Sequence, residues 1–331
     1  MMRAAVIDKP HTASLVETAR PDAGPGEVLV RIAYVGLCGS DLEILHGTSA
    51  YLVDGRAAFP HRFGHEWVGT VEESGPGVTG LRRGEVVTGS TMIPCQACRS
   101  CASGHRNLCT DLREVGLYGW TGAAAEYLVM PRHALVPFGP GTERPRPEHV
   151  LVEPLVTVLE AVDAADPRPG DRILVVGAGT MGSLAAAVLA RYPVTVDIAE
   201  PGTVGHLPPG SYRDRFTRTG EAPTGYDTVV ECSGAPGTLN AALDRLRPGG
   251  LCLLVGVPAQ TETVEPGRIA LDGIRISGVR HGVDHYARAV ALVDELGAGL
   301  VDRVVPLAEV AHAFEVLRLG RTRPKVVLGV G

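Results

Sequence analysis

The stretch that decides the fold class runs from Ile173 to Gly182 and reads ILVVGAGTMG. A short apolar strand leads directly into a G-x-G-x-x-G pattern, and an apolar helical segment follows it. In such a loop the first glycine makes the tight turn, the second lets a pyrophosphate approach the backbone, and the third lets helix and strand pack closely. The free N–H groups of the helix N-terminus can then bind phosphate. The predicted dinucleotide-binding residues are Gly177, Gly179, Thr180, Met181 and Gly182, and a structural turn without a ligand is the alternative.

An acidic residue is expected about twenty residues beyond the first glycine, at the end of the next strand, where it accepts a hydrogen bond from the adenosine ribose. Glu200 in VTVDIAEP has that position, and Asp197 competes with it three residues earlier. An acid here repels a 2′-phosphate, so the pattern favours NAD over NADP. The nearby Arg213, Arg215 and Arg218 could meet a 2′-phosphate, which keeps NADP open.

Strand and helix patterns alternate around this loop, from residue 151 to about residue 283. After an apolar helical stretch at 151–165, strands are predicted at 172–176, 194–199, 227–232, 251–257 and 275–279, with helices at 180–191 and 236–246. Such alternation predicts an α/β domain with a doubly wound parallel sheet. Residues 201–225 contain several prolines and no clear helix, so we predict an irregular connection where a crossover helix is usual.

The first 150 residues have a different pattern. Short β-branched or alternating segments such as GEVLVRIAYVG and WVGTVEESG are separated by Pro-Gly turns. This pattern predicts a compact, mostly antiparallel β domain. A helix at 286–296 and a final strand in KVVLGV are predicted after the α/β part.

Four cysteines lie close together in the run CQACRSCASGHRNLC. Thiols at this spacing can close tetrahedrally around one Zn²⁺, and such a site is structural because it leaves no open coordination position. Disulfides are the alternative, but nothing else in the chain indicates an oxidising compartment. The predicted ligands are Cys95, Cys98, Cys101 and Cys109, in a lobe of about residues 90–112.

The composition argues against several classes of partner. A formal net charge of -6 over 331 residues gives no basic surface for nucleic acid and no polybasic patch for a membrane. The start, MMRAAVIDKPH, turns polar before the apolar core of a signal peptide could form, and no apolar run approaches the length of a bilayer span. We therefore expect a cytoplasmic protein that binds neither nucleic acid nor membrane.

Five motifs stand here in the order seen in the zinc-dependent medium-chain dehydrogenases/reductases: GLCGSD, GHEWVGTVEESG, the four-cysteine lobe, VEPL and GAGTMG. The chain resembles this alcohol dehydrogenase superfamily over nearly its whole length, and most closely its polyol, sugar, threonine and aminocyclitol dehydrogenase branch. The resemblance implies a GroES-like catalytic domain (1–150 and 284–331) and a Rossmann dinucleotide-binding domain (151–283). It also implies a second, catalytic zinc in each subunit, with the ligands Cys38, His65, Glu66 and Glu153.

Taken singly, these four residues have ordinary interpretations, since a lone cysteine is usually a buried small hydrophobe. In the family, zinc polarises the substrate hydroxyl and hydride passes to the nicotinamide. The resemblance gives Ser40 the relay of the proton, although it also suits a helix cap. Glu43 stands where related enzymes usually have histidine, and His46 lies one turn later. The predicted catalytic residues are Ser40, His46 and Glu66.

The implied reaction is oxidation of a secondary alcohol on a polyhydroxylated or amino-substituted small molecule, such as a sugar, a polyol or an aminocyclitol of the deoxy-inosamine kind. A threonine-type 2-amino-3-hydroxy acid dehydrogenase is the near alternative, and a non-catalytic cofactor-sensing homologue is another. In this family the strands near 251–257 and 275–279 continue across a two-fold axis, so we expect a homodimer or homotetramer. Side chains that could reach substrate, each equally compatible with a surface role, are Tyr51, Arg56, Trp120, Arg280 and His281.

Overall fold

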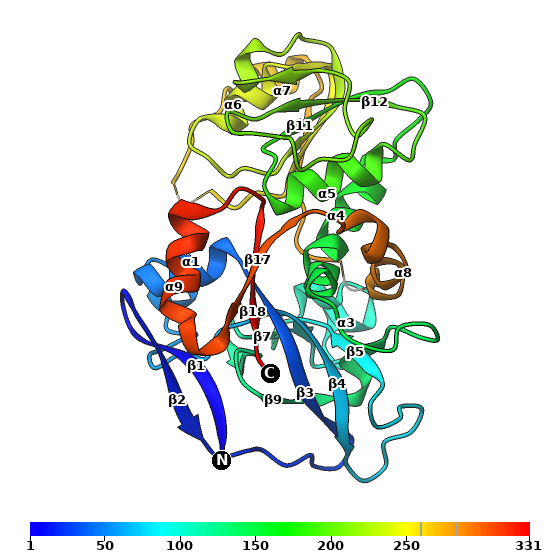
Figure 1. The fold of residues 1–331 in the computed structure, drawn as a ribbon. Helices are drawn as coiled ribbons and strands as arrows, with labels where there is room; N and C mark the ends of the chain where they lie inside the picture. Colours follow the sequence, from blue (N-terminus) through cyan, green and yellow to red (C-terminus); the bar gives the residue numbers. More distant parts are fainter. Residues whose placement is uncertain (259, 283) are drawn as a thin grey trace. The chain divides into compact units, whose positions relative to one another are not determined.

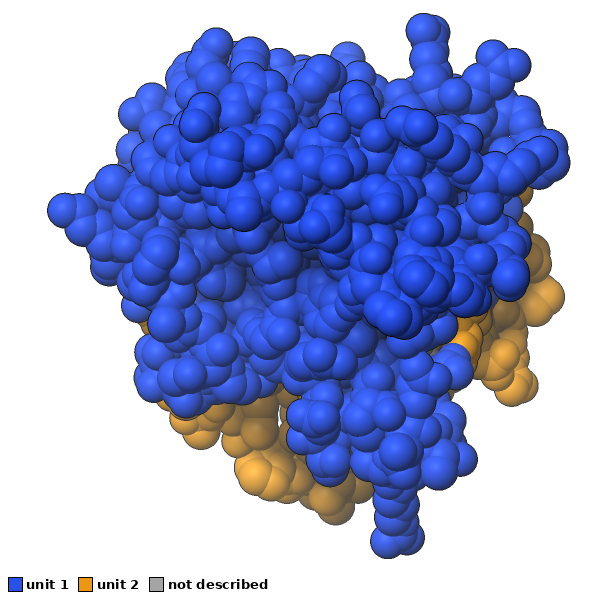
Figure 2. Space-filling model, turned by 90° about the horizontal axis from the view of Figure 1, so that it is seen from below, with its two compact units in different colours: residues 1–153, 286–331 blue, residues 154–285 orange. Residues whose placement is uncertain are grey.

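The computed structural model of this chain describes residues 1–258, 260–282 and 284–331. It divides into two compact units, which Figure 2 shows in different colours. One comprises Met1–Glu153 with Tyr286–Gly331, and the other comprises Pro154–His285. Within the described residues, no helix is long and apolar enough to cross a membrane.

The unit of Pro154–His285 is built on a six-stranded sheet in which every neighbouring pair is parallel. The strand order is β13 (Arg215–Phe216), β12 (Thr195–Ala199), β11 (Arg172–Val176), β14 (Tyr226–Glu231), β15 (Leu246–Leu254) and β16 (Arg275–Gly278). In chain order this is 3-2-1-4-5-6, the doubly wound arrangement that binds a dinucleotide where the strand order reverses, here between β11 and β14. The predicted Rossmann fold is confirmed.

Helices cover this sheet because their apolar residues need burial. Helix α5 (Thr180–Leu189) packs on β11 and β12, and its residues 182–189 are all buried. Helix α6 (Thr238–Leu243) packs on β14 and β15, and α7 (Pro266–Leu271) follows β15 in the chain (Figure 1). Residues 201–225 hold no α-helix, only β13 and a 3₁₀ turn at Thr219–Glu221, as their prolines predict.

The other unit contains a seven-stranded, mostly antiparallel sheet, which confirms the GroES-like prediction. Its order is β10 (Leu135–Pro137), β5 (Val86–Gly89), β4 (Glu66–Ser74), β3 (Glu27–Leu37), β18 (Lys325–Gly329) and β17 (Val301–Pro306), with β9 (Tyr127–Pro131) also paired to β3. Strand β18 comes from the end of the chain and lies between β17 and β3 (Figure 1). The C-terminal segment is therefore part of the same sheet as the N-terminal half.

Smaller elements surround this sheet. They are the hairpin β1 (Met2–Lys9) and β2 (Thr12–Thr18), the strands β6 (Met92–Ile93), β7 (Arg113–Val115) and β8 (Gly119–Trp120), and the helices α1 (Gly39–His46), α2 (Ala50–Val53), α3 (Arg99–Ala102), α8 (Tyr286–Leu296) and α9 (Val310–Glu315). Helix α4 (Val152–Ala165) begins at the unit boundary. The main core cluster includes Phe63, Trp67, Leu128 and Phe314, all at most a few per cent exposed. This packed core holds the ends of β3 and β4 in place for the site described next.

Candidate metal centres and cofactor loop

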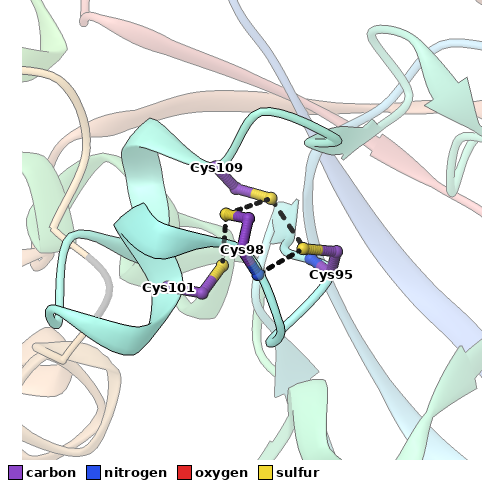
Figure 3. Close-up of side chains that lie close together, drawn as sticks. All are labelled: Cys95, Cys98, Cys101 and Cys109. Carbon is purple, nitrogen blue, oxygen red and sulfur yellow. Dashed lines mark hydrogen bonds between the residues drawn. The ribbon is translucent and has the colours of Figure 1, made fainter.

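The four predicted cysteines point toward one another in the lobe between β6 and β7 (Figure 3). Cys98 Sγ lies 3.5 Å from Cys101 Sγ and 3.9 Å from Cys109 Sγ. A disulfide requires a separation of about 2.05 Å. A tetrahedral zinc with Zn–S bonds of about 2.3 Å holds its sulfurs about 3.8 Å apart. The observed spacing therefore fits a structural zinc site, and all four cysteines are free thiols.

Backbone N–H groups donate hydrogen bonds to these sulfurs and so favour their negatively charged thiolate form. The N–H of Cys98 donates to Cys95 Sγ, and the N–H of Cys95 donates to Cys109 Sγ, both at 3.3 Å. Donors from the backbone of Cys101 and Thr110 lower the pKa of the Cys98 thiol to about 5. The thiolate is the form that binds metal, and Cys98 is already in this form at neutral pH.

Removing one of these ligands is expected to empty this site alone. The described residues form two separate ligand groups, so Cys101→Ser should reduce the zinc content from two ions per chain to one. Without the metal the remaining thiols lose their common partner, so limited proteolysis should cut the loop in residues 95–109. Elemental analysis and mass spectrometry of the fragments measure both effects. The matched control is Cys252→Ala, a buried thiol of β15 outside both groups; a zinc content equal in the two variants would contradict the assignment.

A second group of ligands lies where β3 ends and β4 begins. Ligand atoms of Cys38, His65 and Glu66 all lie within 4.8 Å of one another. Residues far apart in the sequence meet here because β3 and β4 are antiparallel and Gly36 pairs with Glu66. His65 is 4% exposed and Glu66 1%. Buried polar groups of this kind need a partner, and sulfur, nitrogen and oxygen donors together suit zinc.

Asp41, in the first turn of α1, lies beside this group and is the first residue near it that the sequence did not predict. It is fully buried, and its Oδ2 accepts the Cys38 N–H at 2.9 Å. Its Oδ1 lies 3.6 Å from His65 Nδ1, and neither atom has a hydrogen-bond partner among the described residues. Burial opposes the charged imidazole, but Asp41 and Cys38 hold the pKa of His65 well above its usual value. A carboxylate behind the ring nitrogen is the arrangement that orients a metal-bound histidine.

Lys325 is the second residue that the sequence analysis missed. Its Nζ donates to Glu66 Oε1 at 2.7 Å, to Glu66 Oε2 at 2.5 Å and to Leu37 O at 3.2 Å. Lys325 is only 1% exposed. Since β18 pairs with β3, the lysine lies beside the end of β3. The carboxylate of Glu66 therefore takes part in an ion pair as well as in the ligand group.

The remaining predicted residues of this centre have different positions. Glu153, at the start of α4, is not in the group of three. Burial raises its pKa to about 7; the charge of Glu66 also raises this pKa, whereas His65 and Lys325 lower it. Ser40 Oγ lies 3.9 Å from Cys38 Sγ. His46 is at the opposite end of α1, with its ring centroid 5.3 Å from that of His11. Glu43 lies one turn from Ser40, and burial raises its pKa.

The glycine loop has the geometry that the motif predicts. Gly177 has φ of 89°, and a Cβ there would lie 3.0 Å from Ser233 Cβ. A Cβ at Gly182 would lie 1.8 Å from Gly177 O, so the third glycine is needed for packing. A Cβ at Gly179 would meet nothing within 4 Å. The space above Gly179, at the start of α5 where Thr180 and Met181 form the first turn, is therefore open to a phosphate group.

The two candidate ribose acids differ in their surroundings. Asp197 is fully buried, and its carboxylate accepts from Tyr226 Oη and Arg213 Nη2, each at 2.7 Å. Glu200 lies at the loop, where its Oε2 accepts the Ala178 N–H at 2.7 Å. Arg215 donates to backbone carbonyls of residues 200–202. The carboxylate of Asp197 is therefore taken up by hydrogen bonds inside the domain, whereas Glu200 is the acid that lies beside the glycine loop.

Two family models match the chain. One describes an alcohol dehydrogenase GroES-like domain and matches residues 24–140; the other describes a zinc-binding dehydrogenase and matches residues 213–295. Together they account for more than half of the chain. The chain belongs to the zinc-dependent medium-chain dehydrogenases. The resemblance inferred from its motifs is confirmed, and this dehydrogenase is an enzyme of the alcohol dehydrogenase type.

Curated relatives and solved structures agree over nearly the full length of this dehydrogenase. An L-threonine 3-dehydrogenase of Legionella pneumophila (strain Corby) is 28% identical, covering 93% of this chain and 94% of its own. The Aspergillus fumigatus protein named "Probable D-xylulose reductase A" is 28% identical, covering 92% and 90%. The cobalt- and zinc-bound thermostable alcohol dehydrogenase of Pyrobaculum aerophilum has a TM-score of 0.87 at 26% identity, covering 99% of each chain. A zinc-binding dehydrogenase of Sinorhizobium meliloti 1021 bound to NADP has a TM-score of 0.87 at 25% identity, covering 100% and 99%.

Proposed function

We propose that this dehydrogenase oxidises a secondary alcohol of a polyhydroxylated or amino-substituted small molecule, a sugar, polyol or aminocyclitol, to the ketone. The observation that carries the proposal is the group of Cys38, His65 and Glu66, in which the histidine and the glutamate are buried. Its mixed sulfur, nitrogen and oxygen donors match a catalytic zinc that keeps an exchangeable position. The named xylulose reductase and threonine dehydrogenase relatives both act on small hydroxylated molecules, as their names state.

Different residues around that metal site have different roles. A bound zinc would act as a Lewis acid that lowers the pKa of the substrate hydroxyl. Asp41 orients the His65 ring, Lys325 holds the Glu66 carboxylate, and Glu153 is the candidate fourth ligand. Ser40, beside Cys38, accepts the proton that the substrate hydroxyl loses and passes it outward.

For the cofactor we propose NAD as the preferred hydride acceptor. Glu200 lies beside the glycine loop with a carboxylate that favours a free ribose hydroxyl over a 2′-phosphate. Arg213 is held by Asp197 and Asp214, which removes it from the candidates for a 2′-phosphate site. NADP stays open through Arg218, and the S. meliloti relative is bound to NADP.

The proposal is tested by following NADH absorbance with zinc-loaded enzyme and NAD⁺. The substrates are sorbitol, glucose, myo-inositol, an aminodeoxy-inositol and L-threonine, and each is repeated with NADP⁺. Oxidation of one of the first four supports the proposal, whereas oxidation of threonine alone supports the 2-amino-3-hydroxy acid alternative. Absence of any turnover with zinc bound at both sites would overturn the proposal and favour the cofactor-sensing alternative. Homo-oligomeric assembly and a cytoplasmic location stay predictions from the sequence.

The glycine loop offers a separate expected result. Gly179→Val should weaken NADH binding by about tenfold or more without lowering stability, because its side chain enters open space where the pyrophosphate would lie. Gly182→Ala should instead destabilise the protein by about 1–3 kcal/mol, because its Cβ overlaps Gly177 O. NADH fluorescence titration and thermal unfolding measure the two effects. If Gly179→Val binds NADH as tightly as the wild type, the loop does not bind the dinucleotide.

A further inference from the structure

A pocket of about 270 Å³ lies in the unit of Met1–Glu153 and Tyr286–Gly331, between two loops. The first loop leads from α2 to β4, and the second runs through β8. The pocket walls include two arginines, a histidine, two aromatic rings and a hydroxyl, namely Arg56, His61, Arg62, Tyr118, Trp120 and Thr121. Its volume is close to the lower end of the range for small-molecule sites, which suits a sugar-sized ligand or a part of one.

Arg62 is the cation of this pocket without a counter-charge. It is half-buried, and the structure gives it no ion pair with a carboxylate in the described part of the chain. Burial lowers the pKa of the Arg62 guanidinium, and no neighbouring charge opposes that effect. Partial burial of a cation costs free energy unless an anion pairs with it. A planar guanidinium that faces a pocket matches a carboxylate or phosphate with two parallel hydrogen bonds.

The other two basic side chains of the pocket, Arg56 and His61, already have partners. Arg56 pairs with Asp54, with Nη2 and Oδ2 at 2.7 Å, and its guanidinium lies 4.6 Å from the ring centroid of Tyr118. His61 Nε2 lies 2.9 Å from Gly116 O, and burial lowers the pKa of this histidine, so it is neutral at pH 7. The pocket as a whole therefore carries one uncompensated positive charge, from Arg62.

The segment that lines this pocket with Arg62 also carries a residue of the candidate metal group, His65. Arg62 and His65 are three residues apart, so their Cα atoms are separated by at most about 11 Å. The second loop is bonded to this same segment: Gly122 N–H donates to Arg62 O at 3.0 Å, and Ala123 N–H donates to Gly64 O at 2.8 Å. An anion bound at Arg62 would therefore lie in the same part of this unit as an alcohol bound at the Cys38, His65 and Glu66 group.

We propose that Arg62 binds an anionic group, a carboxylate or a phosphate, carried by the alcohol substrate. The inference rests on the proposed function for the identity of that ligand, and on the pocket alone for the anion. It makes an acidic alcohol, a sugar or polyol phosphate or a hydroxy acid, a better substrate than its neutral counterpart.

The experiment uses the zinc-loaded enzyme and has a binding arm and a kinetic arm. In the binding arm, NADH is present at saturation so that the glycine loop is occupied, and inorganic phosphate should then raise the Tm of the wild type and of Arg144→Leu, but not of Arg62→Leu. Arg144 is the matched control because it is an exposed arginine of the same unit outside the pocket. In the kinetic arm, kcat/KM is compared for sorbitol against sorbitol 6-phosphate, and for L-threonine against L-threonine amide, in which a neutral carboxamide replaces the carboxylate. Acid-bearing substrates should be preferred by about tenfold or more, and Arg62→Leu should remove the preference.

The two arms distinguish failure of the anion-site proposal from failure of the proposed function. Preference for the phosphate or for the carboxylate identifies which anion the pocket takes. Equal behaviour of Arg62→Leu and Arg144→Leu in both arms would overturn the proposal, even if neutral alcohols are oxidised. An Arg62-dependent phosphate effect without turnover of any alcohol would support the anion site while rejecting the proposed function. Should Arg62→Leu fail to fold, Arg62→Lys keeps the charge but loses the paired donors, and its phosphate effect should be intermediate.

Discussion

Cys38→Ala is expected to reduce kcat/KM by a factor of about 1,000 or more, equivalent to about 4 kcal/mol of transition-state stabilisation. The cysteine is one of the three ligands grouped at the ends of β3 and β4, and it supplies the only sulfur of that group. Its loss should release the metal that activates the substrate hydroxyl. Steady-state kinetics with the best substrate of the panel, together with zinc analysis, measures the effect.

The same Cys252→Ala control distinguishes a catalytic thiol from a merely buried one. Cys252 lies in β15, is fully buried and belongs to neither ligand group, so this variant should keep both zinc ions and most of the activity. Cys38→Ala should keep the structural zinc and a native circular dichroism spectrum. A Cys38→Ala enzyme with two bound zinc ions and unchanged kcat/KM would show that the catalytic metal is not at this group.

Lys325→Met is expected to lower the free energy of unfolding by about 3–5 kcal/mol. Lys325 and Glu66 are each 1% exposed, and the lysine Nζ bonds both carboxylate oxygens of Glu66. Methionine fills similar space but leaves the buried carboxylate without its counter-charge. Urea unfolding of the wild type and the variant, with zinc removed from both, measures the difference in stability.

Two further variants test the cause of that loss. The double variant Lys325→Met, Glu66→Gln removes the unpaired charge, so it should recover much of the stability. At the surface pair of Arg3 and Glu126, where the arginine side chain is 50% exposed, Arg3→Met should cost less than about 1 kcal/mol. If Lys325→Met costs no more than Arg3→Met, the buried ion pair does not stabilise this fold.

Local pattern was enough to predict much of the fold. The strand at 172–176 and the helix at 286–296 occur with the predicted bounds, because an apolar run and an amphipathic repeat are properties of neighbouring residues. The cysteine lobe was predictable for the same reason, since all four thiols lie in one short loop. The doubly wound parallel sheet was predicted from the glycine loop and the alternation around it, and the structure gives its strand order as 3-2-1-4-5-6.

The fold class, the four-cysteine group and the glycine loop could be predicted from the sequence, because each depends on residues close together in the chain. Which distant side chains lie beside the group of Cys38, His65 and Glu66 could be learned only from the tertiary structure. Lys325 reaches Glu66 because β18 and β4 both pair with β3. Asp41 reaches His65 because α1 follows the end of β3, which pairs with the start of β4. The tertiary structure also placed Asp197 in the interior and His46 at the far end of α1. Long-range strand pairing and burial set these contacts, and neither has a signature in local spacing.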